Sequence, residues 1–140
     1  MEQEKLYCNI IGAELFSGKI SPSPSHISEF FYIAENTDNK DYIEKEALQM
    51  LLYFGCSDFH FFGRQKHLWS RLFSEAKAKT DPTNERRARI MVLDSIDDLV
   101  CELKERTQLK PFVPTDHYLI YDDRKLYEAV KNEIRHVPDK

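Results

Sequence analysis

Aspartates follow two short apolar runs of the sequence, and their carboxylates are the first candidates for chemistry. Asp94 lies in VLDSIDDL (residues 92–99), while Asp122 and Asp123 lie in LIYDDRKL (residues 119–126). Carboxylates at neighbouring strand ends could hold Mg²⁺ through oxygen ligands, as a phosphoryl-transfer or nuclease site requires. The alternative is helix capping, in which an Asp or Ser oxygen accepts hydrogen bonds from the amides of a helix's first turn. Capping accounts for Ser95 and one of the two final aspartates.

A second candidate site is the basic turn in FFGRQKHLWSR (residues 61–71), where a strand ends and a helix begins. Amides at a helix start, together with basic side chains, could bind a phosphate. The stretch lacks both the three-glycine dinucleotide fingerprint and the GK[ST] ending of a P-loop, so a solvated turn is the alternative. The candidate anion-binding residues are Gly63, Arg64, Lys66, His67 and Arg71.

Searches for other catalytic or metal-binding patterns are negative. The sequence contains no G-x-S-x-G elbow, no H-E-x-x-H and no close Cys/His pairing of the zinc type. The sequence has an odd number of cysteines, and they are widely spaced, which indicates reduced thiols: Cys8, Cys56 and Cys101. His60 and His117 interrupt apolar runs and are interpreted as structural. We therefore predict no cofactor, except Mg²⁺ if the aspartates form a site.

Aromatic residues are dense and suggest a second kind of function. Seven Tyr, nine Phe and one Trp supply core side chains, and core packing explains most of them. Some could instead serve as anchors for a protein partner, since Tyr, Trp and Arg are enriched at interaction hot spots. Tyr53 and Trp69 are the candidate partner-binding residues.

Charge is unevenly distributed along the chain. The net charge is −4, yet residues 60–90 carry eight Lys/Arg against three Asp/Glu, a local excess of +5, which leaves −9 for the rest. This net charge does not favour nucleic acid. Such a dipolar molecule could steer a charged partner, although solvated helix faces explain the same pattern.

Apolar periodicity predicts alternating strands and helices. Strands are expected around residues 7–11, with Gly12 at the end, and at 58–62, 89–93 and 117–121; residues 29–34 fit a strand or a helix, and a strand is favoured. Helices are expected over about 41–54, 66–79, 96–107 and 124–134, and Gly55 is expected to end the first helix in a left-handed conformation.

This alternation predicts right-handed βαβ units. The expected fold is a small Rossmann-like three-layer α/β sandwich, with a mostly parallel sheet of four or five strands and helices on both faces. A chain of 140 residues fits one globular domain over 1–140. No apolar run approaches the length of a membrane span, and the N-terminus lacks a signal-peptide pattern, so a cytoplasmic location is expected.

Two functions remain open at this point. The first is a cytosolic, non-enzymatic interaction domain of the inhibitor, immunity or adaptor type, which acts through an aromatic and charged surface on a protein partner. The second is an enzyme or sensor for a nucleotide or phosphate ester, with a site of aspartates at the strand carboxyl ends that works with or without a metal ion. Convergence of the carboxylates beside a cleft would favour the second.

Overall fold

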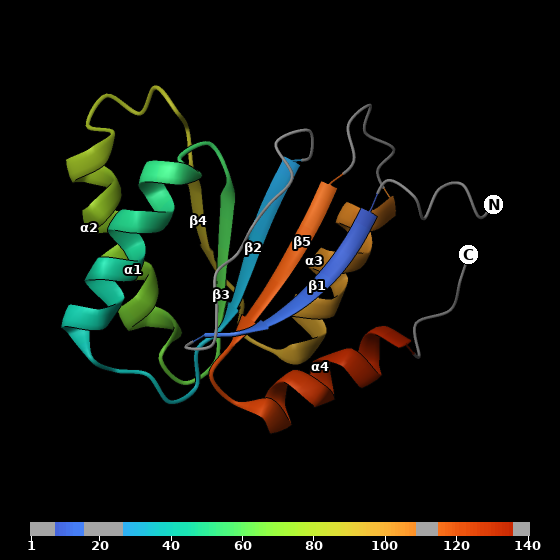
Figure 1. Ribbon diagram of the computed structural model, residues 1–140. Coiled ribbons are helices and arrows are strands. Elements are labelled where there is room, and N and C mark those ends of the chain that lie inside the picture. The colour runs from blue at the N-terminus through green and yellow to red at the C-terminus, as the bar shows by residue number, and fades with distance from the viewer. Residues whose placement is uncertain (1–7, 16–26, 109–114, 136–140) are drawn as a thin grey trace.

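The computed structural model describes residues 8–15, 27–108 and 115–135. Within them, strands and helices alternate after the second strand, and Figure 1 shows the arrangement. The strands are β1 (Cys8–Glu14), β2 (Ile27–Ile33), β3 (Asp58–Phe62), β4 (Arg89–Val92) and β5 (Thr115–Tyr121). The helices are α1 (Lys40–Tyr53), α2 (Lys66–Thr80), α3 (Ile96–Gln108) and α4 (Arg124–Arg135).

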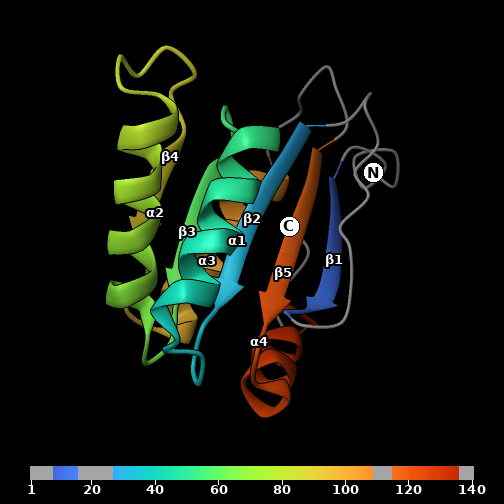
Figure 2. The same ribbon diagram turned by 60° about the vertical axis from the view of Figure 1, so that its left-hand side comes forward.

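The five strands form one parallel sheet in the order β1-β5-β2-β3-β4. Helices α1 and α2 cover one face, whereas α3 and α4 lie on the other (Figures 1 and 2). The chain steps outward from β2 to β4 and then returns through α3 to place β5 between β1 and β2. The predicted Rossmann-like three-layer sandwich is thus confirmed, with five strands.

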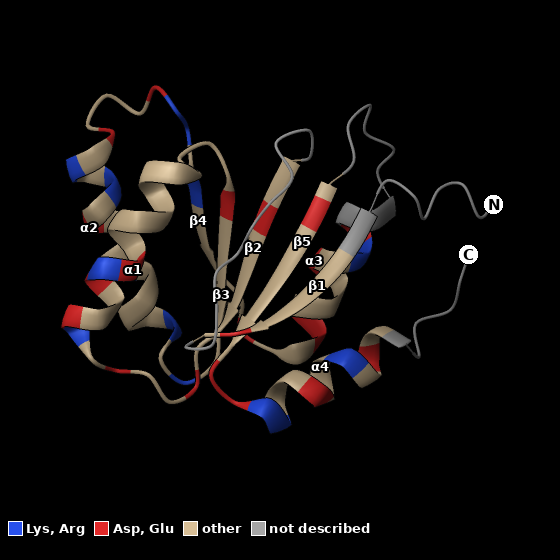
Figure 3. Ribbon diagram, viewed as in Figure 1, with Lys and Arg blue, Asp and Glu red and all other residues tan. Residues whose placement is uncertain are grey.

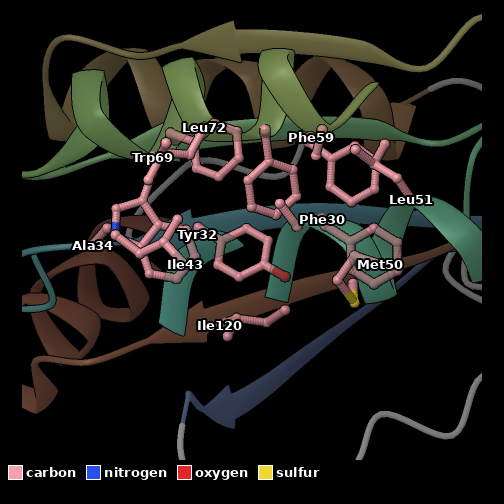
Figure 4. Close-up of a cluster of buried hydrophobic side chains, with 14 of the residues drawn as sticks. Phe30, Tyr32, Ala34, Ile43, Met50, Leu51, Phe59, Trp69, Leu72 and Ile120 are labelled. Atoms are coloured by element: carbon pink, nitrogen blue, oxygen red, sulfur yellow. The ribbon is translucent and has the colours of Figure 1, made fainter. Parts of the chain in front are cut away.

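The larger core lies between the sheet and the α1/α2 layer, and Figure 4 shows part of it. Alternate residues of β2, Phe30 and Tyr32, point into this layer and meet the rings of Phe59, Trp69 and Phe73. Ring centroids in these pairs are 5.1–5.5 Å apart, which is normal for packed aromatic side chains. Most of the aromatic density of the sequence is therefore core.

The second core lies beneath α3 and α4 and takes the intervening residues of β2. Phe31 and Ile33 pack there with Leu99, Leu103 and Val130. Because β2 is central and buried on both faces, it shows a continuous apolar run instead of alternation. This explains the ambiguity of residues 29–34, for which the favoured strand is correct.

Two predictions about glycines are wrong, and at both positions a distant side chain comes close. Gly12 lies inside β1 instead of ending it, because β1 stays paired with β5 as far as Glu14, and the Tyr127 hydroxyl of α4 occupies the space that a Cβ would take. Gly55 is not in the left-handed region; its missing Cβ leaves room for the guanidinium of Arg86. Sequence spacing cannot reveal such approaches, because the partners are more than 30 residues away.

Candidate functional site

Ligands of open parallel sheets bind where neighbouring strands lead their chains to opposite faces. Here that point lies between β2 and β5, because β2 continues to α1 on one face and β5 continues to α4 on the other. The predicted aspartates and basic residues follow strands β3, β4 and β5, so the carboxyl edge of the sheet is the candidate site.

Asp122, directly after β5, is bound by three backbone amides of the β2–α1 loop. Its Oδ1 accepts a hydrogen bond from the N–H of Glu35 at 2.8 Å, and its Oδ2 accepts from Asn36 at 2.9 Å and Thr37 at 2.7 Å. Successive amides converging on one carboxylate form an anion-binding nest, and the anion here is a side chain of the same chain. Asp122 thereby joins the two loops at the switch point.

Asp123 is the N-cap of α4. Its Oδ1 accepts a hydrogen bond from the N–H of Leu126 at 2.9 Å, and its Oδ2 accepts one from Nδ2 of Asn36 at 3.3 Å. These hydrogen bonds, the Leu126 amide foremost, favour the ionised form and lower the pKa of Asp123. Of the final pair, Asp123 is therefore the cap, and Asp122 binds the loop that follows the neighbouring strand β2.

Glu35 faces the predicted anion-binding turn. Its Oε1 accepts a hydrogen bond from the Arg64 N–H at 2.9 Å, and its Oε2 lies 3.5 Å from Nη2 of the same residue. Gly63 precedes with a φ of 110°, and the Ala34 backbone approaches so closely that a Cβ would collide with it. Glu35 and Gly63 thus tie the β3–α2 turn to the β2–α1 loop.

Lys66 and Asp94 make the next connection. The Lys66 Nζ donates to Oδ1 of Asp94 at 3.0 Å, joining the start of α2 to the β4–α3 loop. The Ser95 hydroxyl accepts from the Asp98 N–H at 3.0 Å and caps α3. The Asp94 side chain itself is 80% exposed, so this ion pair contributes little to stability.

These contacts form a continuous series along the carboxyl edge, which we call the carboxyl-edge brace: Asp122 on the amides of 35–37, Glu35 on Arg64, and Lys66 on Asp94. In Figure 3 the loops of this edge carry both signs of charge. Four predicted site residues thus have intramolecular partners at the positions where a ligand was expected: Asp94, Asp122, Arg64 and Lys66.

The structure does not assemble the aspartates into a joint metal site. Strands β2 and β3 lie between β4 and β5, so Asp94 is separated from Asp122 and Asp123 by the intervening strand ends. Among the described residues, no group of three or more His, Cys, Asp or Glu is placed to hold a metal ion. The expectation that these carboxylates come from adjacent strands is corrected, because the β4–β5 crossover returns past two strands.

His67 and Arg71, the remaining residues predicted to bind an anion, are exposed on α2. His67 lies in the first turn of this helix. The Nε of Arg71 lies 3.9 Å from Oε2 of Glu75 on the same helix. Arg71 therefore forms an ordinary i,i+4 pair on a solvated helix face.

The two predicted partner-binding residues have opposite environments. Trp69 is fully buried, and its Nε1 donates to the Thr37 carbonyl at 2.9 Å. The prediction that Trp69 anchors a partner is thus wrong: the side chain belongs to the core and supports the β2–α1 loop. Tyr53 is 73% exposed at the end of α1, and its neighbour Leu52 is 60% exposed.

A polar contact inside the α1 layer was not predicted from the sequence. The Tyr32 hydroxyl donates to Oε2 of Glu46 at 2.8 Å. Burial raises the pKa of Tyr32, and it also raises that of Glu46, although the Tyr32 hydrogen bond partly offsets the latter. Burial and the Glu46 charge raise the pKa of Tyr42 to about 12. A Tyr at position 32 and a Glu at 46 share no local pattern that could have found this contact.

His60 and His117 are both fully buried beneath the α3 layer, on either side of Phe31. The His60 ring stacks on Phe31 at 4.1 Å, and its Nε2 lies 3.7 Å from Oε2 of Glu102. The Nε2 of His117 lies 3.1 Å from Oε1 of Glu29. Each imidazole is thus packed in the core with a glutamate close by, in keeping with the structural interpretation.

The fold defines this chain as a small parallel α/β sandwich whose strand carboxyl ends are joined by its own side chains. No protein-family model, curated protein or solved structure matches it. No helix within the described ranges is both long and apolar enough to span a membrane.

Proposed function

We propose that this chain is a non-enzymatic protein-interaction domain of the inhibitor, immunity or adaptor kind, acting in the cytoplasm. The observation that carries the proposal is the pair Leu52 and Tyr53, two large apolar side chains next to each other that are 60% and 73% exposed. Tyr53 is of a residue type common in interaction hot spots. The carboxyl-edge brace supports the proposal. In it, the residues that a phosphate-binding enzyme would use are bonded to other groups of the same chain.

The test compares the chain in the cells that produce it with the purified protein. On size-exclusion chromatography, the protein in a fresh lysate should elute as a larger complex than the purified protein at equal concentration. The complex should resist nuclease and should be rebuilt from the chain and one purified partner. Elution at the position of the purified protein would contradict the proposal.

A phosphate-ester site remains the second candidate, and one observation favours it. The amides of Glu35, Asn36 and Thr37 already converge on an anion at the switch point, where phosphate ligands bind in folds of this kind. A ligand phosphate would have to displace Asp122. Thermal unfolding with a panel of nucleotides and Mg²⁺ tests this function, since a ligand at 100 times its Kd stabilises a protein by about 2.7 kcal/mol. A stabilisation that grows in Asp122→Asn would favour the second candidate, because the neutral side chain competes less with a phosphate for the three amides.

A further inference from the structure

The last turn of α1 and the loop between α2 and β4 form one surface at the end of the sheet opposite the carboxyl-edge brace (Figures 1 and 2). Its members are Leu52 and Tyr53 from α1 and Arg86 and Arg87 from the loop, and we call it the 52/87 surface. The two parts are 34 residues apart in sequence and are in direct contact, since Nη2 of Arg86 donates to the Leu52 carbonyl at 3.2 Å.

Leu52 and Tyr53, the apolar residues of this surface, do not belong to the core of the protein. The buried residues of α1 are Ile43, Ala47, Met50 and Leu51, and Phe54 contacts the ring of Phe30 at 4.9 Å. Leu52 and Tyr53 lie between these residues in sequence but face away from the core. Scattered single exposed apolar residues are ordinary, whereas Leu52 and Tyr53 are consecutive and are 60% and 73% exposed. We call these two side chains the patch.

The patch is held in place by the loop. The Arg86 guanidinium donates to the carbonyls of Leu51 and Leu52 at 3.2 Å each, and it lies against Gly55, where a Cβ would collide with it. The Asp81 carboxylate in turn accepts from the backbone N–H groups of Glu85 at 3.0 Å and Arg86 at 2.9 Å. A surface fixed in advance loses less conformational entropy on binding.

The charge beside the patch indicates the chemistry of the partner. Arg87 is exposed and has a φ of 63°, a left-handed conformation that a non-glycine residue adopts at a cost in free energy. It follows Arg86 in the chain, and α2 ends nearby with Lys77 and Lys79 in its last turn. Two acidic side chains, Asp81 and Glu85, lie in the same loop, but the Asp81 carboxylate is occupied by the two loop amides. Lys77 is likewise engaged, since its Nζ donates to the Ala88 carbonyl at 2.7 Å. The exposed charged residues of this region are Lys79, Glu85 and Arg87, so the exposed charge is net positive.

We infer that the 52/87 surface binds an acidic protein segment that presents an apolar residue to Leu52 and Tyr53 and carboxylates to Arg87. The inference rests on the proposed function and adds the chemistry of the partner. A protein segment is chosen over nucleic acid because the proposed function is protein interaction and because the aliphatic Leu52 is exposed beside Tyr53.

The test uses a library of random dodecapeptides displayed on phage and selected on the full chain. Selected peptides should share an aliphatic or aromatic residue flanked by Asp or Glu. Fluorescence polarisation should show at least tenfold weaker binding to the double variant Leu52→Ser/Tyr53→Ser. Arg87→Asn removes the charge with a residue that tolerates the left-handed backbone, and it should weaken binding about two- to fivefold at low salt. The matched control, Asp41→Asn, changes an exposed residue in the first turn of α1, at the opposite end of the helix, and should leave binding unchanged.

Three results would overturn the inference. One is a selection that yields no binder or only peptides without acidic residues. Another is unchanged binding to the double variant, provided that its circular dichroism and melting temperature match those of the wild type. The third is binding of a 20-nucleotide oligothymidylate that the double variant abolishes. The lysate experiment separates this inference from the proposed function. If the double variant still forms the complex, the 52/87 surface is not the binding site, although the proposed interaction function stands. If the wild type forms no complex, the proposed function itself fails.

Discussion

The carboxylate of Asp122 accepts a hydrogen bond from the backbone N–H of Thr37 at 2.7 Å, across 85 residues of sequence. The carboxylate also accepts from the next two amides toward β2, so one side chain satisfies three donors of a loop that has no regular secondary structure. The adjoining Thr37 carbonyl accepts from Trp69. The β2–α1 loop is thus fixed from the sheet side by Asp122 and from the core side by Trp69.

Replacing Asp122 by Ala should lower the free energy of unfolding by about 2–3 kcal/mol, because three amides lose a charged acceptor. Asp122→Asn retains an acceptor oxygen and should cost less. Urea unfolding measures both. The control is Asp94→Ala, which removes an exposed ion pair and should cost less than about 1 kcal/mol. Equal effects of the two alanine variants would refute the special role of Asp122.

The contribution of Asp123 to stability should depend on pH. Its folded-state pKa is lowered below the ordinary value of 3.8, so the stabilisation is complete above that value and is lost as the pH falls through the folded-state pKa. Asp123→Ala should therefore cost about 1 kcal/mol at pH 7, as for other N-caps, and progressively less from pH 4 to pH 2. Asp123→Asn keeps a capping oxygen and should retain most of the neutral-pH stability. A cost for Asp123→Ala that is constant with pH would contradict the capping role of the carboxylate.

Glu46 should show the opposite pH dependence. Burial raises its folded-state pKa, so the ionised form is disfavoured in the folded protein, and the destabilisation grows as the pH rises above the ordinary value of 4.5. Glu46→Gln should thus stabilise the protein at pH 7 and have a smaller effect at pH 4, since the amide oxygen can still accept from Tyr32. Chemical unfolding at the two pH values measures the difference. In the Tyr32→Phe background the hydrogen bond that lowers the Glu46 pKa is absent, and the pH dependence should increase; a decrease would show that this assignment is wrong.

A methyl group at position 12 should be destabilising because of Tyr127. The Tyr127 ring stacks on Tyr121 at 4.0 Å, and its hydroxyl fills the space above Gly12. Gly12→Ala should cost about 1–3 kcal/mol through overpacking. The cost should be smaller in the Tyr127→Leu background, where the side chain is shorter. A double-mutant cycle by urea unfolding separates this coupling from the effect of each substitution, and strict additivity would exclude the contact as the cause.

The sequence by itself determined the elements and their assembly into a parallel α/β sandwich. Apolar periodicity and cap residues are local signals, and they placed the element ends to within a few residues. Examples are α1, with its buried Ile43 and Leu51, and the cap at Ser95. Central burial of β2 made residues 29–34 ambiguous, because a strand buried on both faces loses its alternation. The sequence also singled out the basic turn at residues 61–71 and Tyr53 as candidate binding residues, without showing their surroundings.

Only the tertiary structure decided what those positions do. The strand order places β5 beside β2, which brings Asp122 to the 35–37 amides, while Asp94 pairs with Lys66 beyond the two intervening strands. Whether an aromatic side chain is core or surface depended likewise on the layer it faces, so Trp69 is buried and Tyr53 is exposed. Side-chain contacts across 28–87 residues follow from the crossover connections, and no local sequence pattern carries that information.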